Sequence, residues 1–525
     1  MPVTLLNEQV YYEHGGNPFK GLHRWYSRKP LSFSRASVLG SLLPADVTME
    51  EFEWLLGLNR RVAGIQDKTT KLYKTPPSPE RIKRVQELCE QMWGTKTPTV
   101  LDAFAGGGSI PFEAARYGLN VLASDLNPVA VVTMKAAIEY PLKFGADLQV
   151  EIDKWVKWVG DEAEKRLAPF FPSLPGEKVQ NYLWAHTVKC PNCESIVPLS
   201  PNWWLSKTSN YAGKGQARRV TSDWYAVQPI PNPEAKRIDF KLVQGKKGTG
   251  ITIQVNGKEF DPSDYNTISG GVGKCLNCDA VIEDEVIKAY AQSVGFGHQM
   301  YAIAYRKGEG KLEFRIPSQV DLEYYYEAEK FLENNRIRWE SSKFLPTQEI
   351  PSNTHRGPDM YLYGVYQWSQ LFNLRQLLVL VTYAEIINDA KHKILEEVKD
   401  EKAEAIISFL ALILDRCADE NCRMSHWNSA RDGSEGFSAQ HSLNLMWNYI
   451  EIDGVRKLWN YQGKSTISDY LSLCAYSGAD SKLVEIYERN LETGTVLIDA
   501  ASADSLFHIP DRSLEDVLKV SRGQI

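Results

Sequence analysis

Residues 99–127, TVLDAFAGGGSIPFEAARYGLNVLASDLN, constrain the possible folds more than any other part of the chain. A short apolar run ends at Asp102, a cluster of glycines follows, and a helical pattern leads into a second apolar run that ends at Asp125. We interpret this order as the first half of a nucleotide-binding α/β unit. Glycines let the backbone turn sharply and approach a ligand closely. A plain tight turn is the alternative interpretation.

The bulk composition sets the class of protein. A chain of 525 residues predicts two or three domains, and 43% hydrophobic with 24% charged residues is typical of a globular protein. The net charge of −6 gives no overall basicity, so any nucleic-acid surface has to be a local patch.

Targeting signals are not apparent in the sequence. The N-terminus lacks a basic region followed by an apolar core, and the apolar run at 406–414 is too short to span a bilayer. Eight cysteines are too few for a disulfide scaffold in a chain of this size. We therefore expect a cytoplasmic protein with no membrane partner.

Two short cysteine pairs indicate a metal site. Cys190 and Cys193 form one CxxC motif, and Cys275 and Cys278 form another. Four thiolates at this spacing suit a tetrahedral, structural zinc ion that takes no part in chemistry. Free thiols or a redox pair are the alternatives. Alternating apolar residues and turn signals between the pairs predict a β-rich insertion.

A basic and aromatic cluster, HRWYSRKP, lies at 23–30 just ahead of a helical pattern at 36–43. Such a cluster suits an anion or carboxylate site at a helix N-terminus. Taken alone, however, the cluster is better explained as a solvated basic turn that leads into a helix. Farther along, TPPSPE at 75–80 predicts a break and a helix start, and residues 364–415 predict a helical hairpin.

Two polar and aromatic stretches are candidates for nucleic-acid contact. The stretch 202–219 contains two tryptophans and the basic residues Lys207, Lys214, Arg218 and Arg219. Rings that stack on bases and cations that bind phosphate are typical of such contacts. The loop 421–451 contains Arg423, His426, Trp427 and Arg431. The alternatives are a small tryptophan core beside a basic loop, and a structural polar loop.

The form of the glycine turn distinguishes two cofactors. The pattern is DxFxGxG and not the GxGxxG of dinucleotide enzymes. With Asp125 at the end of the next strand, it looks like motifs I and II of S-adenosylmethionine-dependent methyltransferases. A third strand is predicted at 496–498, and Asp504 after it is expected to approach the adenine of the cofactor.

The chain as a whole resembles a family of adenine-specific DNA methylases that contain a zinc ribbon, some of them found in phage-defence settings. HRWYSRKPLS, DAFAGGGSIPFEAARYG, the CPNC and CLNC pair and the block MSHWNSARDG…FSAQHSLNLMWNY carry the resemblance. It implies an α/β fold whose Rossmann-like methyltransferase core is interrupted, between its second and third strands, by a β-rich zinc-ribbon insertion and a helical insertion. It also implies methyl transfer from S-adenosylmethionine to the exocyclic amino group of an adenine flipped out of double-stranded DNA.

The resemblance and the motifs together assign residues to the cofactor and the metal. Those expected at S-adenosylmethionine are His23, Lys29, Pro30, Asp102, Phe104, Gly106, Gly108, Asp125, Asn127 and Asp504. Those expected at zinc are Cys190, Cys193, Cys275 and Cys278. The predicted segments are 1–98 (cofactor motif and helices), 99–140 (first half of the core), 141–362 (zinc ribbon), 363–480 (helical insertion) and 481–525 (return to the core).

One feature departs from the family. Enzymes of this kind use a (D/N)PP(Y/F) tetrapeptide to hold the target amine and stack on the base, and this sequence has none. We therefore name no catalytic residue, and we expect a truncated or split reading frame. The alternative function is a cofactor- and DNA-binding part that needs a C-terminal methylase half or other defence-system subunits. An RNA amino-methyltransferase is a further alternative.

Overall fold

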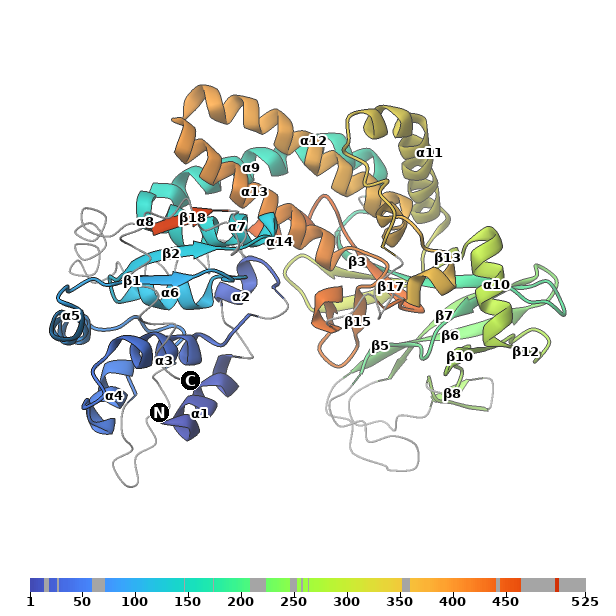
Figure 1. Cartoon of the computed structure of the whole chain (residues 1–525). Helices are drawn as coiled ribbons and strands as arrows, with labels where there is room; N and C mark the ends of the chain where they lie inside the picture. Colours follow the sequence, from blue (N-terminus) through green and yellow to red (C-terminus); the bar gives the residue numbers. More distant parts are fainter. Residues whose placement is uncertain are drawn as a thin grey trace. The chain divides into compact units, whose positions relative to one another are not determined.

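The structure is a computed structural model, drawn in Figure 1. It describes residues 1–13, 18–25, 28–58, 71–145, 147–172, 174–207, 223–245, 253–255, 258–262, 264–351, 359–440, 444–463 and 496–499. The chain divides into two compact units. Unit 1 comprises Met1–Lys157, Ala390–Ile413 and Gln462–Ile525, and unit 2 comprises Trp158–Asp389 and Leu414–Tyr461.

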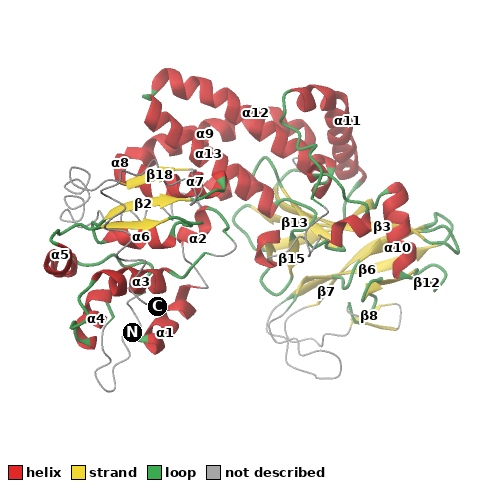
Figure 2. Cartoon of the chain, viewed as in Figure 1, coloured by secondary structure: helices red, strands yellow, loops and turns green. Residues whose placement is uncertain are grey.

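Unit 1 is built on a parallel sheet of three strands in the order β1 (Thr99–Asp102), β2 (Asn120–Ser124) and β18 (Val496–Asp499). Val100 lies opposite Val121 in one pair, and Leu122 lies opposite Leu497 in the other. The strands lie side by side in Figure 2. All three coincide with the apolar runs of the sequence, so these strand predictions are confirmed. Because the strands are parallel, their carboxyl ends meet at one edge of the sheet.

The helices of unit 1 start and end at the signals that their sequences carry. They are α1 (Val3–Glu13), α2 (Pro18–Leu22), α3 (Leu31–Leu42), α4 (Met49–Leu56), α5 (Pro79–Trp93), α6 (Ser109–Arg116), α7 (Pro128–Met134), the π-turn η1 (Lys135–Glu139) and α8 (Tyr140–Phe144). Thr48 caps α4, Gly57 ends it with a positive φ, and Pro79 begins α5 as predicted. Helix α6 packs on β1 and β2, and α3 packs on α6.

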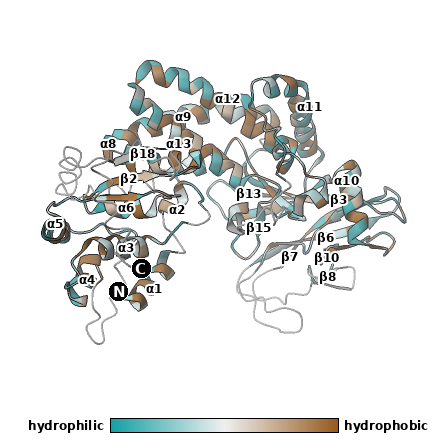
Figure 3. Cartoon of the chain, viewed as in Figure 1, coloured by the Kyte–Doolittle hydropathy of each residue, from teal (hydrophilic) through white to brown (hydrophobic). Residues whose placement is uncertain are grey.

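Hydropathy follows this packing. Strand β2 is brown in Figure 3, whereas the polar helix α5 is largely teal. Val121 is fully buried, and the apolar side chains of Ala36 and Leu39 on α3 are also buried. The core of unit 1 therefore lies between the sheet, α6 and α3.

Three of the four limits between the two units fall within long helices, which are α9 (Asp147–Leu167), α12 (Leu374–Glu397) and α13 (Asp400–Glu420). The predicted helical hairpin is confirmed as α12 and α13, although its first helix begins at Leu374. Among the described helices, none combines the length and apolar character that crossing a membrane requires.

Unit 2 is built on an antiparallel sheet in the order β14-β13-β3-β17, with β4 paired to the end of β3. These strands are β3 (Glu177–Lys189), β4 (Ile196–Leu199), β13 (Gly297–Lys307), β14 (Leu312–Arg315) and β17 (Asn448–Ile452). Trp184 on β3 lies opposite Met300 on one side and Tyr449 on the other. The sheet therefore pairs strands from distant parts of the sequence.

Smaller strands and helices complete unit 2. The strands are β5 (Trp204–Ser206), β6 (Trp224–Asn232), β7 (Arg237–Gly245), β8 (Ile253–Val255), β9 (Lys258–Phe260), β10 (Ile268–Ser269), β11 (Val272–Lys274), β12 (Val281–Ile282), β15 (His426–Asn428) and β16 (Gly433–Glu435). The helices are η2 (Ala168–Phe170), α10 (Asp284–Val294), α11 (Gln319–Ser341), η3 (Asp359–Tyr363), η4 (Trp368–Leu371), η5 (Phe437–Gln440) and α14 (Leu458–Gly463). The β-rich region predicted between the cysteine pairs is confirmed, while its turn at 256–257 lies outside the described residues.

Candidate functional site

The glycine turn between β1 and α6 adopts a conformation that needs glycine. Gly106 and Gly108 have φ values of +52° and +79°, which side chains rarely tolerate. Gly108 also lies against Met134, so that a Cβ atom there would meet the Met134 side chain at 2.8 Å. The backbone of Ala105 donates to the carbonyl of Ser124 at 3.0 Å, which joins the turn to the end of β2.

Asp125, at the end of β2, is bonded to this turn. One oxygen, Oδ2, accepts from the backbone N–H of Gly106 at 2.8 Å, and Oδ1 accepts from the N–H of Asn127 at 2.9 Å. Asn127 in turn caps helix α7 by accepting from the N–H of Val129 at 2.9 Å. A carboxylate has about four acceptor positions, so two remain for a ligand. The structure therefore brings the predicted residues Gly106, Asp125 and Asn127 together.

Asp102 ends β1 at the same edge of the sheet. Its Oδ1 accepts from the N–H of Phe104 at 3.3 Å. Burial raises the pKa of Asp102, and the nearby negative charge of Asp125 raises it further. Phe104 is 81% exposed and Leu126 is 73% exposed, so two apolar side chains lie open beside the two acids. A ligand with hydroxyl groups and positive charge would find acceptors and apolar contacts here.

The N-terminal cluster lies against the turn, through residues that the sequence did not single out. A Cβ atom at Gly106 would meet the Trp25 indole at 2.7 Å, and one at Gly107 would meet the Arg28 guanidinium at 2.6 Å. Arg28 also lies over the Phe19 ring, 4.3 Å from its centroid. The only signal for Trp25 and Arg28 was their place in the HRWYSRKP string.

The predicted residues of that string occupy different positions. His23 is partly buried, Lys29 is exposed, and Pro30 is the residue before α3. The start of α3 is occupied by the chain's own carboxylate, because Glu13 accepts from the backbone N–H groups of Leu31 and Ser32, both at 3.0 Å. The predicted anion site at this helix start is therefore taken by Glu13, and a ligand does not need to fill it.

A buried ion network holds α6, the helix that follows the turn. Arg35 on α3 donates to Glu113 at 2.7 Å, and Arg116 donates to the other oxygen of Glu113 at 2.8 Å. Arg35 also donates to the carbonyl groups of Leu56 and Leu72, both at 3.1 Å. Burial lowers the pKa of Arg35, but the charge of Glu113 outweighs it and the net shift is upward. Residues far from the turn in sequence thus fix its helix.

The third strand completes the described part of this edge. β18 lies next to β2, on the side away from β1. Asp504 lies outside the described residues, so its expected contact with adenine stays a prediction.

The four predicted metal ligands come together in unit 2. The sulfur atoms of Cys190, Cys193, Cys275 and Cys278 all lie within 4.8 Å of one another. The separation is 3.7 Å for Cys190 and Cys278 and 3.6 Å for Cys193 and Cys275. A tetrahedral zinc site with Zn–S bonds of about 2.3 Å requires sulfur separations of roughly 3.8 Å. The donor set and its dimensions therefore fit zinc.

The two cysteine turns share one backbone conformation. The residue after each second cysteine, Glu194 or Asp279, has a positive φ, of 63° and 56°. Backbone N–H groups of the turn hydrogen-bond to the sulfur of each first cysteine, Cys190 and Cys275. Burial nevertheless raises the pKa of Cys275 to about 12, while a hydrogen bond with Ser195 lowers that of Cys193 to about 6. Metal binding to this set has to release protons.

Two of the candidate nucleic-acid residues are part of the core of unit 2. Trp203 and Trp204 are 0% and 4% exposed, so the alternative of a small tryptophan core is confirmed. Lys207 is described, whereas Lys214, Arg218 and Arg219 lie outside the described residues. In the later loop, Trp427 donates to the carbonyl of Leu205. The rings of Trp203 and Trp204 are therefore not available to stack on bases.

Three other residues of the later loop differ in exposure. His426 contacts Glu435 at 3.1 Å, and Arg431, with an 81% exposed side chain, lies 3.7 Å from the same carboxylate. Arg423 is only 8% exposed and faces a cavity within unit 2. Contact of 421–451 with DNA or an extruded base therefore stays a prediction, in which Arg423 is buried at a cavity and the indole N–H of Trp427 is bonded within unit 2.

Comparison with known proteins connects the turn to one enzyme family. Residues 82–164, which include β1, the glycine turn, β2 and Asp125, match the family model of the D12 class N6 adenine-specific DNA methyltransferases. Residues 1–58 match the family model of a protein of unknown function, DUF1156. No curated protein and no solved structure matched the chain. The resemblance to adenine-specific DNA methyltransferases is thus confirmed for residues 82–164, and it supports a methyltransferase at the level of the family.

Proposed function

We propose that this chain takes part in transferring a methyl group from S-adenosylmethionine to the exocyclic amino group of adenine in DNA. The observation that carries the proposal is the hydrogen bond from Gly106 to Asp125, inside the stretch that matches the methyltransferase family. The bond sets an acid at the carboxyl end of β2 directly beside a tight glycine turn. Ligands of open α/β sheets bind at this edge.

The residues at this edge suit the chemistry of the cofactor. S-adenosylmethionine supplies the methyl group when it is bound. The free acceptor positions of Asp125 suit ribose hydroxyls, and the acids Asp102 and Asp125 together favour a ligand that carries positive charge. Gly106 and Gly108 leave room for the methionine part, and Phe104 and Leu126 offer apolar contact. His23, Lys29, Pro30 and Asp504 remain proposed cofactor residues.

We further propose that β1, β2 and β18 are the first three strands of a Rossmann-like core. In the doubly wound order 3-2-1-4-5-6, the third strand pairs with the second on the side away from the first. β18 pairs with β2 in this way, although more than 370 residues separate the two strands in the sequence. In this proposal the zinc ribbon and the helices are insertions between the second and third strands, and the protein acts in the cytoplasm, in phage defence.

A second candidate function is favoured by the sequence itself. No (D/N)PP(Y/F) string occurs among the 525 residues. The chain would then provide cofactor and DNA binding, and a partner polypeptide would provide the group that holds the target amine.

The decisive experiment uses S-adenosylmethionine with a labelled methyl group and unmethylated double-stranded DNA. We expect label in N6-methyladenine, either with this chain alone or after addition of a polypeptide that carries the tetrapeptide strand. Activity without addition contradicts the second candidate. Absence of label in both cases contradicts the methyltransferase proposal, and label in transfer RNA but not in DNA redirects it to RNA.

A further inference from the structure

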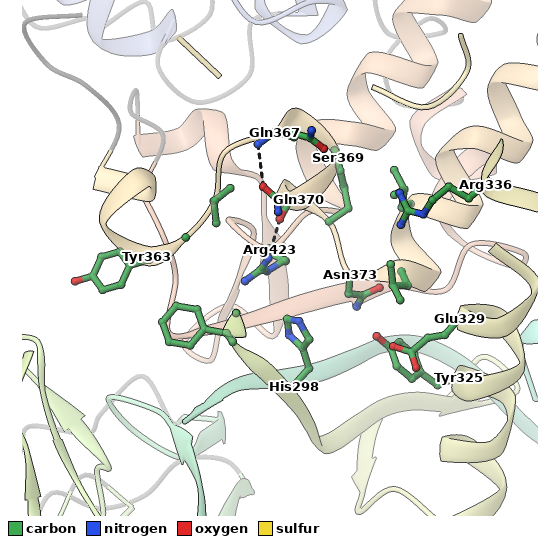
Figure 4. Close-up of a pocket in the computed structure, with 17 residues that line it drawn as sticks. His298, Tyr325, Glu329, Arg336, Tyr363, Gln367, Ser369, Gln370, Asn373 and Arg423 are labelled. Atoms are coloured by element: carbon green, nitrogen blue, oxygen red, sulfur yellow. Dashed lines mark hydrogen bonds between the residues drawn. The ribbon is translucent and has the colours of Figure 1, made fainter. Parts of the chain in front are cut away.

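Unit 2 contains a cavity of 310 Å³ that the methyltransferase proposal does not use. Its wall is formed by the start of β13, one side of α11, the segment 363–377 and Arg423, all within unit 2. Figure 4 shows Arg423 between Gln370 and His298. The volume lies within the range of small-molecule sites, about 300–1,000 Å³.

Arg423 is a buried cation whose hydrogen-bonding capacity is largely unused. Its Nη1 donates to the carbonyl of Gln370 at 2.7 Å. Its Nε is buried and has no hydrogen-bond partner among the described residues. No described carboxylate forms an ion pair with it, and burial lowers its pKa. An arginine stays charged in proteins, so this buried charge is uncompensated by the surrounding side chains.

Arg375 and Arg35, two fully buried arginines among the described residues, are each paired with a carboxylate, which Arg423 is not. Arg375, also in unit 2, donates to both oxygens of Glu451 at 2.6 and 3.0 Å. Its guanidinium further lies over the ring of Tyr182, 4.2 Å from the centroid. Arg35 in unit 1 has Glu113. A cation that lacks such a partner but lies at a cavity indicates that the partner comes from outside.

The remaining wall can hold a small molecule but adds little negative charge. His298 shares a hydrogen bond of 3.0 Å with Tyr449, and burial lowers its pKa well below the usual value, so it is neutral. Phe296 and Phe372 contribute apolar faces. Among the described lining residues the one carboxyl group is Glu329, whose pKa burial raises.

The other charged groups of the described lining do not pair with Arg423. Glu329 lies on α11 one turn after Tyr325, and Figure 4 places both on the far side of Asn373 from Arg423. Arg336 at the wall is 2.7 Å from Glu333 and 3.6 Å from Glu340. Arg423 is thus the group in the described lining that is left to recognise an anion.

We propose that this cavity binds a small organic anion, whose phosphate or carboxylate group is held by Arg423 and whose apolar part lies against Phe296 and Phe372. The guanidinium fork matches the planar or tetrahedral oxygens of these groups. The proposal does not rest on the methyltransferase function, because the cavity lies within unit 2.

Calorimetry with the full chain tests the proposal. The probes are phenyl phosphate, benzoate and benzyl alcohol, which distinguish a phosphate from a carboxylate and from an uncharged ring compound, and none of them contains the adenosine part of the proposed cofactor. We expect phenyl phosphate or benzoate to bind and benzyl alcohol not to bind. Binding of benzyl alcohol with equal affinity overturns the proposal, and so does failure of both organic anions to bind.

Variants assign the binding to this cavity. Arg423→Gln should weaken binding at least about tenfold, because it removes a charge-assisted hydrogen bond. Arg423→Lys keeps the charge without the fork and should give an intermediate affinity. The control is Arg338→Gln. Arg338 is an exposed arginine of α11, the helix that contributes Arg336 to the wall, but Arg338 itself does not line the cavity, so binding should be unchanged. Asp125→Asn should also leave it unchanged, which separates this site from the cofactor site.

A second measurement does not depend on the folding of a variant. A crystal structure of the wild-type chain with the bound probe should show its anionic group within hydrogen-bond distance of Arg423. Density for the probe elsewhere, with none at Arg423, overturns the proposal and leaves Arg423 a structural residue.

Discussion

The glycine turn of unit 1 and the cysteine cluster of unit 2 are both made from short loops, but they depend on the rest of the chain to different degrees. Each cysteine turn sets its own geometry, since the N–H groups that bond to Cys190 come from Asn192 and Cys193. The glycine turn depends on Asp125 from the next strand and on Arg35 from the N-terminal helices. A metal site can thus be predicted from two four-residue CxxC motifs, whereas a ligand site such as the glycine turn also depends on contacts with distant residues.

The largest effect that this comparison predicts is at the cysteine cluster. Cys190→Ser should release zinc and unfold the region around both turns, because structural zinc supplies on the order of 10 kcal/mol to such sites. Elemental analysis should find one zinc per wild-type chain and none in the variant.

The matched control is Cys417→Ala, a buried cysteine of unit 2 outside the cluster, which should keep its zinc. Full zinc content and unchanged thermal unfolding in Cys190→Ser would contradict the metal assignment.

The next effect concerns the support of the glycine turn. Glu113→Gln leaves the guanidinium groups of Arg35 and Arg116 buried without their carboxylate, which should cost about 3–5 kcal/mol of stability. Urea unfolding followed by circular dichroism measures this loss.

Glu51→Gln is the matched control, because the Glu51–Arg84 pair also joins two helices of unit 1 but its side chains are 29% and 36% exposed. Its loss should cost less than about 1 kcal/mol. Equal losses in the two variants would show that the buried network does not hold α6.

A smaller effect is expected at the acid beside the turn. Asp125→Asn should raise the dissociation constant for S-adenosylmethionine at least about tenfold, because hydrogen bonds to a charged group contribute roughly 1.5–3 kcal/mol. Calorimetry measures this change. Asp147→Asn, an exposed acid of the same unit, should bind the cofactor like the wild type. An unchanged constant in Asp125→Asn would exclude the ribose assignment.

The smallest effect is a change in stability with pH at Asp102. Burial raises the pKa of this carboxyl group in the folded protein, so the folded state holds its proton more tightly than the unfolded state does. The contribution of Asp102 to the free energy of unfolding therefore increases as the pH falls through the pKa of Asp102 in the folded protein towards its pKa in the unfolded chain, about 3.9.

Asp102→Asn removes the ionised form, so its Tm should exceed that of the wild type at pH 7, by less than about 4 °C. The difference should shrink as the pH is lowered towards 4.5, which thermal unfolding at several pH values will show. A Tm below that of the wild type at pH 7 would show that the charge of Asp102 stabilises the fold.

The sequence predicted those features that depend on local pattern. Apolar runs marked β1, β2 and β18, and apolar periodicity marked α12 and α13. The CxxC spacing marked four thiols that the fold brings within 4.8 Å. The structure agrees with these predictions because a strand, a helix and a metal-binding turn are each determined by a few neighbouring residues.

Residue roles that depend on distant contacts were not predicted. Trp203 and Trp204 could be stacking platforms or core residues by composition, and only packing shows them to be buried. Nothing in the sequence indicates that Glu13 occupies the start of α3, or that Trp25 and Arg28 lie against the glycine turn. Such contacts join residues many positions apart, and no periodic pattern records them.

By itself, then, the sequence determined the strand–turn–helix–strand unit with its two acids and the set of four cysteines, because each is encoded in consecutive residues. The tertiary structure alone decided which charges are compensated. Arg35 and Arg375 are each buried with a carboxylate brought from a distant segment, whereas Arg423 is buried without one at a cavity. The three arginines are alike in the sequence, and burial cost and pairing in three dimensions give them different roles.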